Sequence, residues 1–133
     1  MSGSPLSSTP STVREYQVRA HTTRTFGRVM ANARNHHIVI DGPIQNGCPG
    51  EEITPVELFL GGVAACGAEL IQVIARDENV PLEDVDVVVN GVIDRANQPR
   101  PDVTLFTSVH VDVTLTGTDP ARAASLVEGF KRR

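Results

Sequence analysis

The longest apolar stretch of the chain is residues 54–75, TPVELFLGGVAACGAELIQVIA, where apolar side chains occupy nearly every face of a helix. Thr54 suits the N-cap, Pro55 the first helical position, and Glu57 follows the cap by three residues. Such a helix spans roughly 33 Å. Because Glu57 and Glu69 would be costly in lipid, we expect the central helix of a soluble core, buried on all sides.

Strand-like patterns precede this helix. Residues 13–22, 24–32 and 36–41 are predicted strands, and Gly27 marks a bulge or a tight hairpin approach within the second. Residues 42–53, rich in Gly and Pro, are predicted to form a loop.

Two strands and a helix are predicted after it. Residues 85–93 are rich in β-branched side chains, and residues 103–115 alternate apolar with polar positions, which predicts a long strand with one wet face. A helix begins at Asp119-Pro120, with one apolar stripe that comprises Ala123, Leu126, Val127 and Phe130. The order β-β-β-α-β-β-α indicates an α+β fold with antiparallel sheet and helices on one face.

Composition narrows the class of protein. Residues 1–12, rich in Ser, Pro and Thr, are predicted to be a disordered tail, and residues 13–133 to form a single domain. The net charge of −4 argues against nucleic acid or an anionic membrane as the main partner. Two cysteines without a signal peptide favour a cytoplasmic location.

Cys66, in the middle of the long helix, is the first candidate for chemistry. Gly61 and Gly62 precede it, and each costs the helix about 1 kcal/mol relative to Ala. That cost predicts that another backbone or a substrate packs close there. On position alone, Cys66 would be a small buried hydrophobe, which is how most free cysteines behave.

Other groups of residues give weaker indications of a functional site. His36 and His37 are adjacent on a predicted strand and therefore point to opposite faces. No zinc spacing, phosphate loop, dinucleotide fingerprint or Ser-His-Asp motif is present. We therefore expect neither a metal nor a cofactor.

The stretch TPVELFLGGVAAC, residues 54–66, resembles the signature of the OsmC/Ohr family, in which an (N/T)P-x-E-L segment opens a central helix that carries a reactive cysteine. FGRVMANARNHHIVIDGP, residues 26–43, resembles the second and third strands of that family, which end in a D-x-P turn. The resemblance covers roughly residues 13–133.

This resemblance implies an OsmC-like fold, an intertwined homodimer whose central helices pack beneath antiparallel sheets, with two sites at the subunit interface. It also implies a role in the oxidative stress response: peroxidases of the family reduce organic hydroperoxides. Their central cysteine, here Cys66, becomes a sulfenic acid, a second cysteine closes a disulfide, and a dithiol reductant restores the thiols.

The attacking group must be a thiolate, which needs a nearby positive charge. Cys66 lies too far from the helix N-terminus for the helix dipole to help. In the peroxidases an arginine stands in a pattern like R-x-x-G-x-V, so the resemblance points to Arg24, with Arg28 as the alternative. Either arginine could instead be a solvated strand residue.

The acidic residue departs from the peroxidase pattern. The peroxidases carry a glutamate directly after the proline, where it holds the arginine, whereas this chain has Val56 there and the acid at Glu57. Glu57 lies about 180° around the helix from Cys66, so it would serve a site across the interface, or only the capping box of Thr54. This P-x-E-L form resembles the less characterised OsmC-like branch.

The second cysteine also departs from the pattern of the family peroxidases. The family places it in a Cys-Pro pair on the second helix, and this chain ends at Arg133, about where that pair would begin, as if truncated in this helix. Cys48 is then the intramolecular candidate, in a loop that could move; otherwise it is a loop thiol.

Three functions remain open from the sequence. The first is thiol-dependent reduction of organic hydroperoxides by Cys66. The second is a non-catalytic module that binds a small apolar ligand or thiol. The third is a structural relic in which the cysteine is simply buried.

Overall fold

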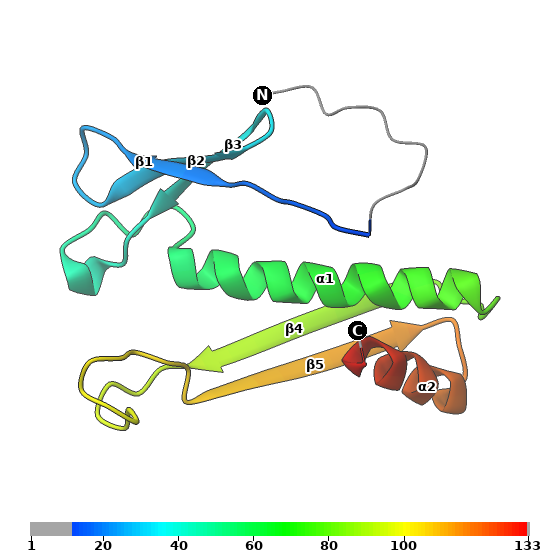
Figure 1. Cartoon of the computed structure of the whole chain (residues 1–133). Coiled ribbons are helices and arrows are strands. Elements are labelled where there is room, and N and C mark those ends of the chain that lie inside the picture. Colours follow the sequence, from blue (N-terminus) through cyan, green and yellow to red (C-terminus); the bar gives the residue numbers. More distant parts are fainter. Residues whose placement is uncertain (1–11, 133) are drawn as a thin grey trace. The chain divides into compact units, whose positions relative to one another are not determined.

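The computed structural model describes residues 12–132, and contacts divide the chain into two compact units, residues 1–54 and 55–133 (Figure 1). The element order β-β-β-α-β-β-α is as predicted, with one added 3-10 turn. The predicted disordered tail, residues 1–12, lies outside the described residues except for Thr12.

The first unit contains a three-stranded antiparallel sheet in the order β1-β2-β3. The strands are β1 (Arg19–Thr22), β2 (Arg28–Ala33) and β3 (His36–Asp41), and the 3-10 turn η1 (Ile44–Asn46) follows them. β3 has the predicted bounds.

The first two predicted strands were too long. Residues 13–18 are exposed and belong to no described strand, so β1 begins only at Arg19. Residues 24–27 form the turn between β1 and β2, where Gly27 has φ of 81°, a left-handed conformation that favours glycine. Gly27 therefore makes the tight turn that its position in the sequence indicated.

The second unit packs two helices on one face of a two-stranded antiparallel sheet (Figure 1). Its elements are α1 (Pro55–Asp77), β4 (Asp84–Val92), β5 (Ser108–Thr116) and α2 (Pro120–Lys131). Asp119 is the N-cap of α2, where its side chain accepts a hydrogen bond from the backbone N–H of Arg122 at 2.8 Å. Both helix starts agree with the sequence signals.

The core of this unit lies where the second half of α1 meets α2 and the sheet. Its buried members are Ile71, Ile74, Ala75 and Leu126, and the half-buried side chains around them are Val80, Leu82, Val85, Val113, Leu115 and Phe130. A Cβ on Gly67 would lie 3.2 Å from Cζ of Phe130, so the missing side chain lets α2 approach α1 closely.

β5 begins five residues later than the alternation predicted. Ser108 pairs with Val92, the last residue of β4, so residues 103–107 have no strand opposite them. Within β5 the predicted alternation holds, and Val109, Val111, Val113 and Leu115 share one face.

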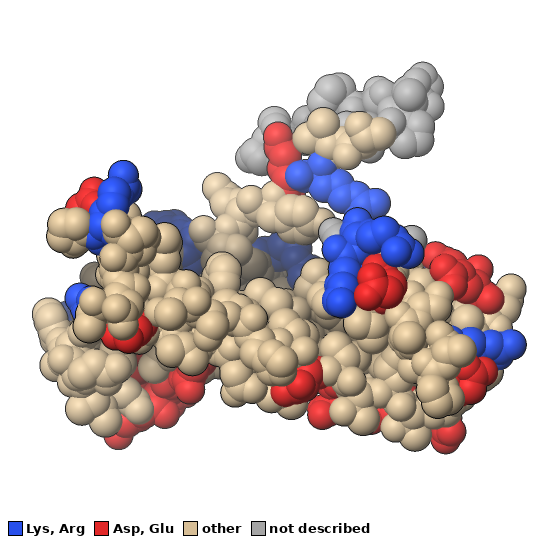
Figure 2. Space-filling view, turned by 90° about the horizontal axis from the view of Figure 1, so that it is seen from below, with Lys and Arg blue, Asp and Glu red and all other residues tan. Residues whose placement is uncertain are grey.

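The prediction that α1 is buried on all sides was wrong for the described chain. Its buried residues are Gly67, Ile71, Ile74 and Ala75, and the opposite face is open. By length and composition alone α1 could cross a membrane, a test that core helices of soluble proteins also pass. Figure 2 shows the molecule from below the view of Figure 1: uncharged residues cover most of this surface, and Asp and Glu lie on it in separate small groups.

Candidate functional site

Cys66 lies halfway along α1, on its open face. The side chain is exposed, so the alternative of a small buried hydrophobe is wrong for the described chain. Phe59 precedes Cys66 by seven residues, which places both on the same face of the helix, about 10 Å apart along its axis. The thiol is therefore accessible and shares its face with an aromatic ring that is 63% exposed.

Gly61 and Gly62 do not pack against anything within the described chain. A Cβ on either residue would meet no atom within 4 Å. The expected close approach of a backbone or substrate is therefore absent here, in contrast to Gly67, whose missing side chain makes room for Phe130.

An apolar cavity of about 450 Å³ lies at the N-terminal end of α1. Its lining comprises Pro55, Val56, Phe59, Ile93, Thr104, Leu105 and Phe106. The volume falls within the range of small-molecule sites, roughly 300–1,000 Å³. Apolar side chains dominate the lining, so this cavity suits an apolar group.

Two aromatic rings fix one side of the cavity. Phe59 of α1 and Phe106, two residues before β5, stack with their ring centroids 6.1 Å apart and their planes inclined by 24°. A Cβ on Gly91 of β4 would lie 2.7 Å from Cε1 of Phe106 and 3.0 Å from Cδ1 of Leu60. Glycine at this strand position therefore leaves the space that the Phe106 ring occupies.

The acid of the P-x-E-L segment lies away from the thiol. Glu57 is in the first turn of α1, and nine helical residues separate it from Cys66, so the two point to opposite faces of this helix. Val56, which stands where the family peroxidases carry their glutamate, is instead part of the cavity lining.

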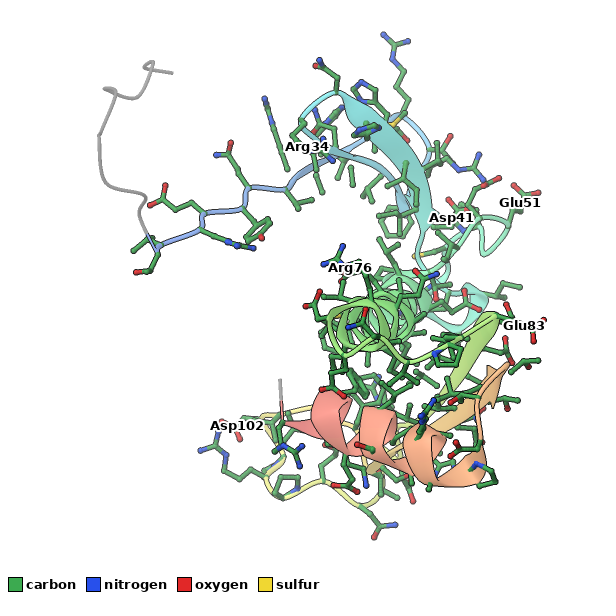
Figure 3. The ribbon with its side chains drawn as sticks, turned by 90° about the vertical axis from the view of Figure 1, so that its right-hand side faces the viewer. Arg34, Asp41, Glu51, Arg76, Glu83 and Asp102 are labelled. Carbon is green, nitrogen blue, oxygen red and sulfur yellow. The ribbon has the colours of Figure 1, made fainter. Side chains whose placement is uncertain are left out.

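Arg28, the alternative charge partner, is already engaged. Its Nε and Nη2 donate to Oδ1 and Oδ2 of Asp41 at 2.7 and 2.8 Å, and Nη2 also donates to Oε1 of Glu51 at 2.8 Å. Asp41 is fully buried. Figure 3 shows Asp41 and Glu51 beside each other in this unit.

The surroundings of Asp41 favour its charged form. The hydrogen bond from Arg28 holds the pKa of Asp41 well below its ordinary value, and backbone N–H groups of Glu52 and Glu51 add to this effect. Burial of the carboxyl opposes the shift but is outweighed. Arg28 and Asp41 thus form a structural ion pair, which the sequence did not reveal because alternation gives the face of a residue and not its partner.

Arg24, the first choice as charge partner, lies in the turn between β1 and β2 and not on a strand. Its side chain is exposed, and among the described residues it forms no ion pair. Its guanidinium is therefore available, unlike that of Arg28.

Cys48 is a free thiol wedged between two glycines. A Cβ on Gly27 or on Gly42 would lie 2.5 Å from the sulfur of Cys48, so both glycines make room for this side chain. The backbone N–H of Cys48 also donates to the carbonyl of Pro43 at 3.3 Å. These contacts hold the sulfur in place, which favours the interpretation as a loop thiol.

Among residues 12–132, no three His, Cys, Asp or Glu side chains gather as metal ligands would.

The sequence did not predict the cavity, since Ile93, Leu105 and Phe106 fit the pattern of ordinary strand residues. Gly91, inside a run of valines, was the available signal that another side chain approaches closely there.

A comparison with models of protein families identifies the family. The model of the OsmC-like protein family matches residues 48–133, which is more than half of the chain. The chain belongs to the OsmC-like family. No match was found among curated proteins.

Solved structures share the fold of this OsmC-like protein. An organic hydroperoxide resistance protein from Legionella pneumophila is 22% identical, with a TM-score of 0.71 over 92% of this chain and 85% of that one. An OsmC-like protein from Mycoplasma pneumoniae is 15% identical, with a TM-score of 0.75 over 90% and 82%. An organic hydroperoxide resistance protein from Elizabethkingia anophelis is 14% identical, with a TM-score of 0.73 over 92% and 85%.

Proposed function

We propose that this OsmC-like protein reduces organic hydroperoxides and uses Cys66 as the nucleophile. The observation that carries the proposal is the accessible thiol of Cys66 on the helix face that also lines an apolar cavity, two turns away. An accessible thiol and an apolar surface on the same helix face are what the reduction of an apolar hydroperoxide requires.

The reaction balances in two stages. The Cys66 thiolate attacks the outer oxygen of the hydroperoxide, the O–O bond breaks, and the leaving alkoxide takes up a proton to become an alcohol. Cys66 is oxidised to a sulfenic acid. A dithiol reductant then forms a mixed disulfide with loss of water, and its second thiol releases Cys66 while the reductant becomes a disulfide. We place this cycle in the reducing cytoplasm.

Arg24 is the residue that we assign to stabilise the thiolate. Its side chain is exposed and without an ion pair among the described residues, whereas Arg28 is held at two points by Asp41. An exposed arginine without an ion pair gives up no partner when it binds a thiolate, while Arg28 would first have to abandon a buried carboxylate.

A homodimer is part of the proposal. The open face of α1 carries Phe59, which is 63% exposed, and Gly61 and Gly62 leave space for a second helix. A second copy of α1 would cover this apolar face. Because Glu57 points away from the Cys66 of its own helix, a catalytic role for Glu57 would concern the thiol of the other subunit. Size-exclusion chromatography with light scattering should give twice the chain mass; a monomer at micromolar concentration contradicts the dimer.

The test of catalysis compares the two thiols. Native protein, Cys66→Ser and Cys48→Ser are assayed with cumene hydroperoxide and dithiothreitol. We expect the rate of Cys66→Ser to fall to the uncatalysed background and Cys48→Ser to retain most of the native rate. Equal rates for native protein and Cys66→Ser would remove Cys66 from the mechanism.

The charge partner is tested in the same assay. Arg24→Gln should lower kcat/KM by about tenfold or more, the size expected when one charge-stabilising group is lost. Arg28→Gln would disturb the fold, so its unfolding midpoint is measured beside its rate. Native kcat/KM in folded Arg24→Gln contradicts the assignment.

The cavity also supports a second candidate, a non-catalytic module that binds an apolar ligand or thiol. Val56 lines the cavity in place of an acidic side chain, so the lining offers no carboxylate to hold an arginine. Slow stoichiometric alkylation of Cys66 by iodoacetamide, without peroxide consumption, would favour this function.

A further inference from the structure

We infer that Gln98 is a positioning residue that holds one wall of the apolar cavity and so determines which apolar groups the site accepts. This inference rests on the proposed function for the identity of the ligand, but the contacts that carry it lie within residues 91–107 and α1. They concern the backbone of Leu105, not the chemistry of Cys66.

Gln98 pairs with the backbone of Leu105 through its side-chain amide. The backbone N–H of Leu105 donates to Oε1 of Gln98 at 2.7 Å, and Nε2 of Gln98 donates to the carbonyl of Leu105 at 3.1 Å. The side chain thus satisfies both backbone groups of Leu105, as a neighbouring strand would. No strand lies opposite Leu105, because β4 ends at Val92.

The amide of Gln98 is itself anchored. Its Nε2 also donates to the carbonyl of Asp94 at 2.7 Å, and Gln98 is half-buried. Asp94 is fixed in turn by hydrogen bonds from the side chain of Asn97 at 2.6 Å and from the backbone N–H of Ala96 at 3.0 Å. These bonds lower the pKa of Asp94, so it remains a carboxylate near neutral pH.

The wall of the cavity depends on this clamp. Leu105 lines the cavity together with Phe106, yet its side chain is 55% exposed, so packing alone does not fix it. Phe106 is held by stacking on Phe59 and by the space above Gly91. The hydrogen bonds of Gln98 hold Leu105 in position, just as these contacts hold Phe106 in position. Loss of the clamp should let the Leu105 backbone move while Phe106 stays in place.

The deciding experiment compares Gln98→Met with two other variants. Methionine keeps the length of the side chain and removes its hydrogen bonds, and Leu105→Ala removes the wall itself. Arg100→Gln is the control, because it breaks an exposed ion pair with Asp102 in the same loop that does not involve Gln98 or Asp94. Two readouts are used: the affinity for the fluorescent apolar probe N-phenyl-1-naphthylamine, and kcat and KM for cumene hydroperoxide and for hydrogen peroxide.

We expect Gln98→Met and Leu105→Ala to weaken probe binding by about five- to tenfold, the effect of one or two lost hydrogen bonds or contacts. KM for cumene hydroperoxide should rise similarly with kcat unchanged. Hydrogen peroxide has no apolar body to enter the cavity, so the loss in Gln98→Met and Leu105→Ala should be severalfold smaller with hydrogen peroxide than with cumene hydroperoxide. Arg100→Gln should match the native protein. A purely structural role for Gln98 would affect both peroxides alike.

Three results would overturn the inference: unchanged probe affinity in folded Gln98→Met, equal losses for both peroxides, or no probe binding by the native protein. If no variant consumes peroxide, the proposed function fails while the probe still decides the role of Gln98. If Gln98→Met does not fold, hydrogen exchange of the native Leu105 amide decides: we expect protection, and exchange as fast as in an unstructured peptide would overturn the inference.

Discussion

Arg28 and Asp41 face each other in the register of β2 and β3 and form a two-point ion pair, with Nε to Oδ1 at 2.7 Å and Nη2 to Oδ2 at 2.8 Å. Oδ2 of Asp41 also accepts the backbone N–H groups of Glu51 and Glu52 at 3.0 and 2.9 Å. The backbone N–H of Asp41 donates to the carbonyl of Ile53 at 3.0 Å. One buried carboxylate thus ties the end of the sheet to residues 51–53.

Asp41→Asn should destabilise the first unit. Asparagine has an –NH2 group in place of one carboxylate oxygen, so Arg28 and a backbone N–H lose acceptors at a buried position. Breaking one side of a buried ion pair in this way is strongly unfavourable. We expect the midpoint of thermal unfolding, followed by circular dichroism, to fall by several degrees. Glu51→Gln is the control, because Glu51 meets Arg28 at an exposed position where ion pairs contribute little. Equal midpoints for the two variants would show that the buried contact adds nothing.

The same carboxylate predicts the response to acid. Its pKa in the folded chain lies below the ordinary value of about 3.9, so its contribution to the free energy of unfolding is complete above roughly pH 5. The contribution is lost as the pH falls below that value toward the folded pKa. The stability difference between native protein and Asp41→Asn, from urea unfolding at about pH 7, 5 and 3, should therefore stay constant and then shrink. A difference that grows in acid would contradict the assignment.

Local signals explain what the sequence predicted well. β3 and both helix starts depend on residues within a few positions, such as Pro55 and Asp119 at the helix N-termini. The family, too, was predicted from a local motif around Cys66.

Non-local contacts explain what it did not predict. Thr104 and Leu105 alternate like a strand, yet the partner of Leu105 is the side chain of Gln98, and no pattern announces a side chain that replaces a strand. Arg28 was a candidate for the thiol because its face was known, but its pairing with Asp41 depends on the register of β2 and β3. The sequence of one chain also could not tell that α1 has an open face.

Gly91→Ala should destabilise the second unit, because Gly91 is closely packed, whereas Gly61 and Gly62 of α1 are not. The added methyl would meet Phe106 and Leu60 at 2.7 and 3.0 Å, and overpacking of this kind costs about 1–3 kcal/mol. Urea unfolding measures the loss, and probe binding in the cavity should weaken with it because Phe106 must shift.

Gly61→Ala is the matched control. Its methyl meets open space within the chain, so the helix should gain up to about 1 kcal/mol. A loss for Gly61→Ala that varies with protein concentration would place Gly61 in a contact between subunits. A loss for Gly91→Ala no larger than for a substitution at an exposed position of β4 would show that Phe106 relaxes freely.

Substrate length provides the sharpest check on the link between cavity and thiol. Phe59 and Cys66 are seven residues apart on one helix face, about 10 Å, so a short hydroperoxide at the sulfur leaves the cavity empty. Across a series of straight-chain alkyl hydroperoxides, kcat/KM should rise by up to about fourfold per methylene as the chain enters the cavity, since each buried methylene contributes roughly 0.8 kcal/mol. The rise should level off once the cavity is filled. Phe59→Ala removes an exposed ring that lines the cavity, so it should flatten the rise with chain length; its unfolding midpoint is measured beside the rates because Phe59 also stacks on Phe106. A native protein that reduces all chain lengths equally would separate the cavity from the chemistry of Cys66.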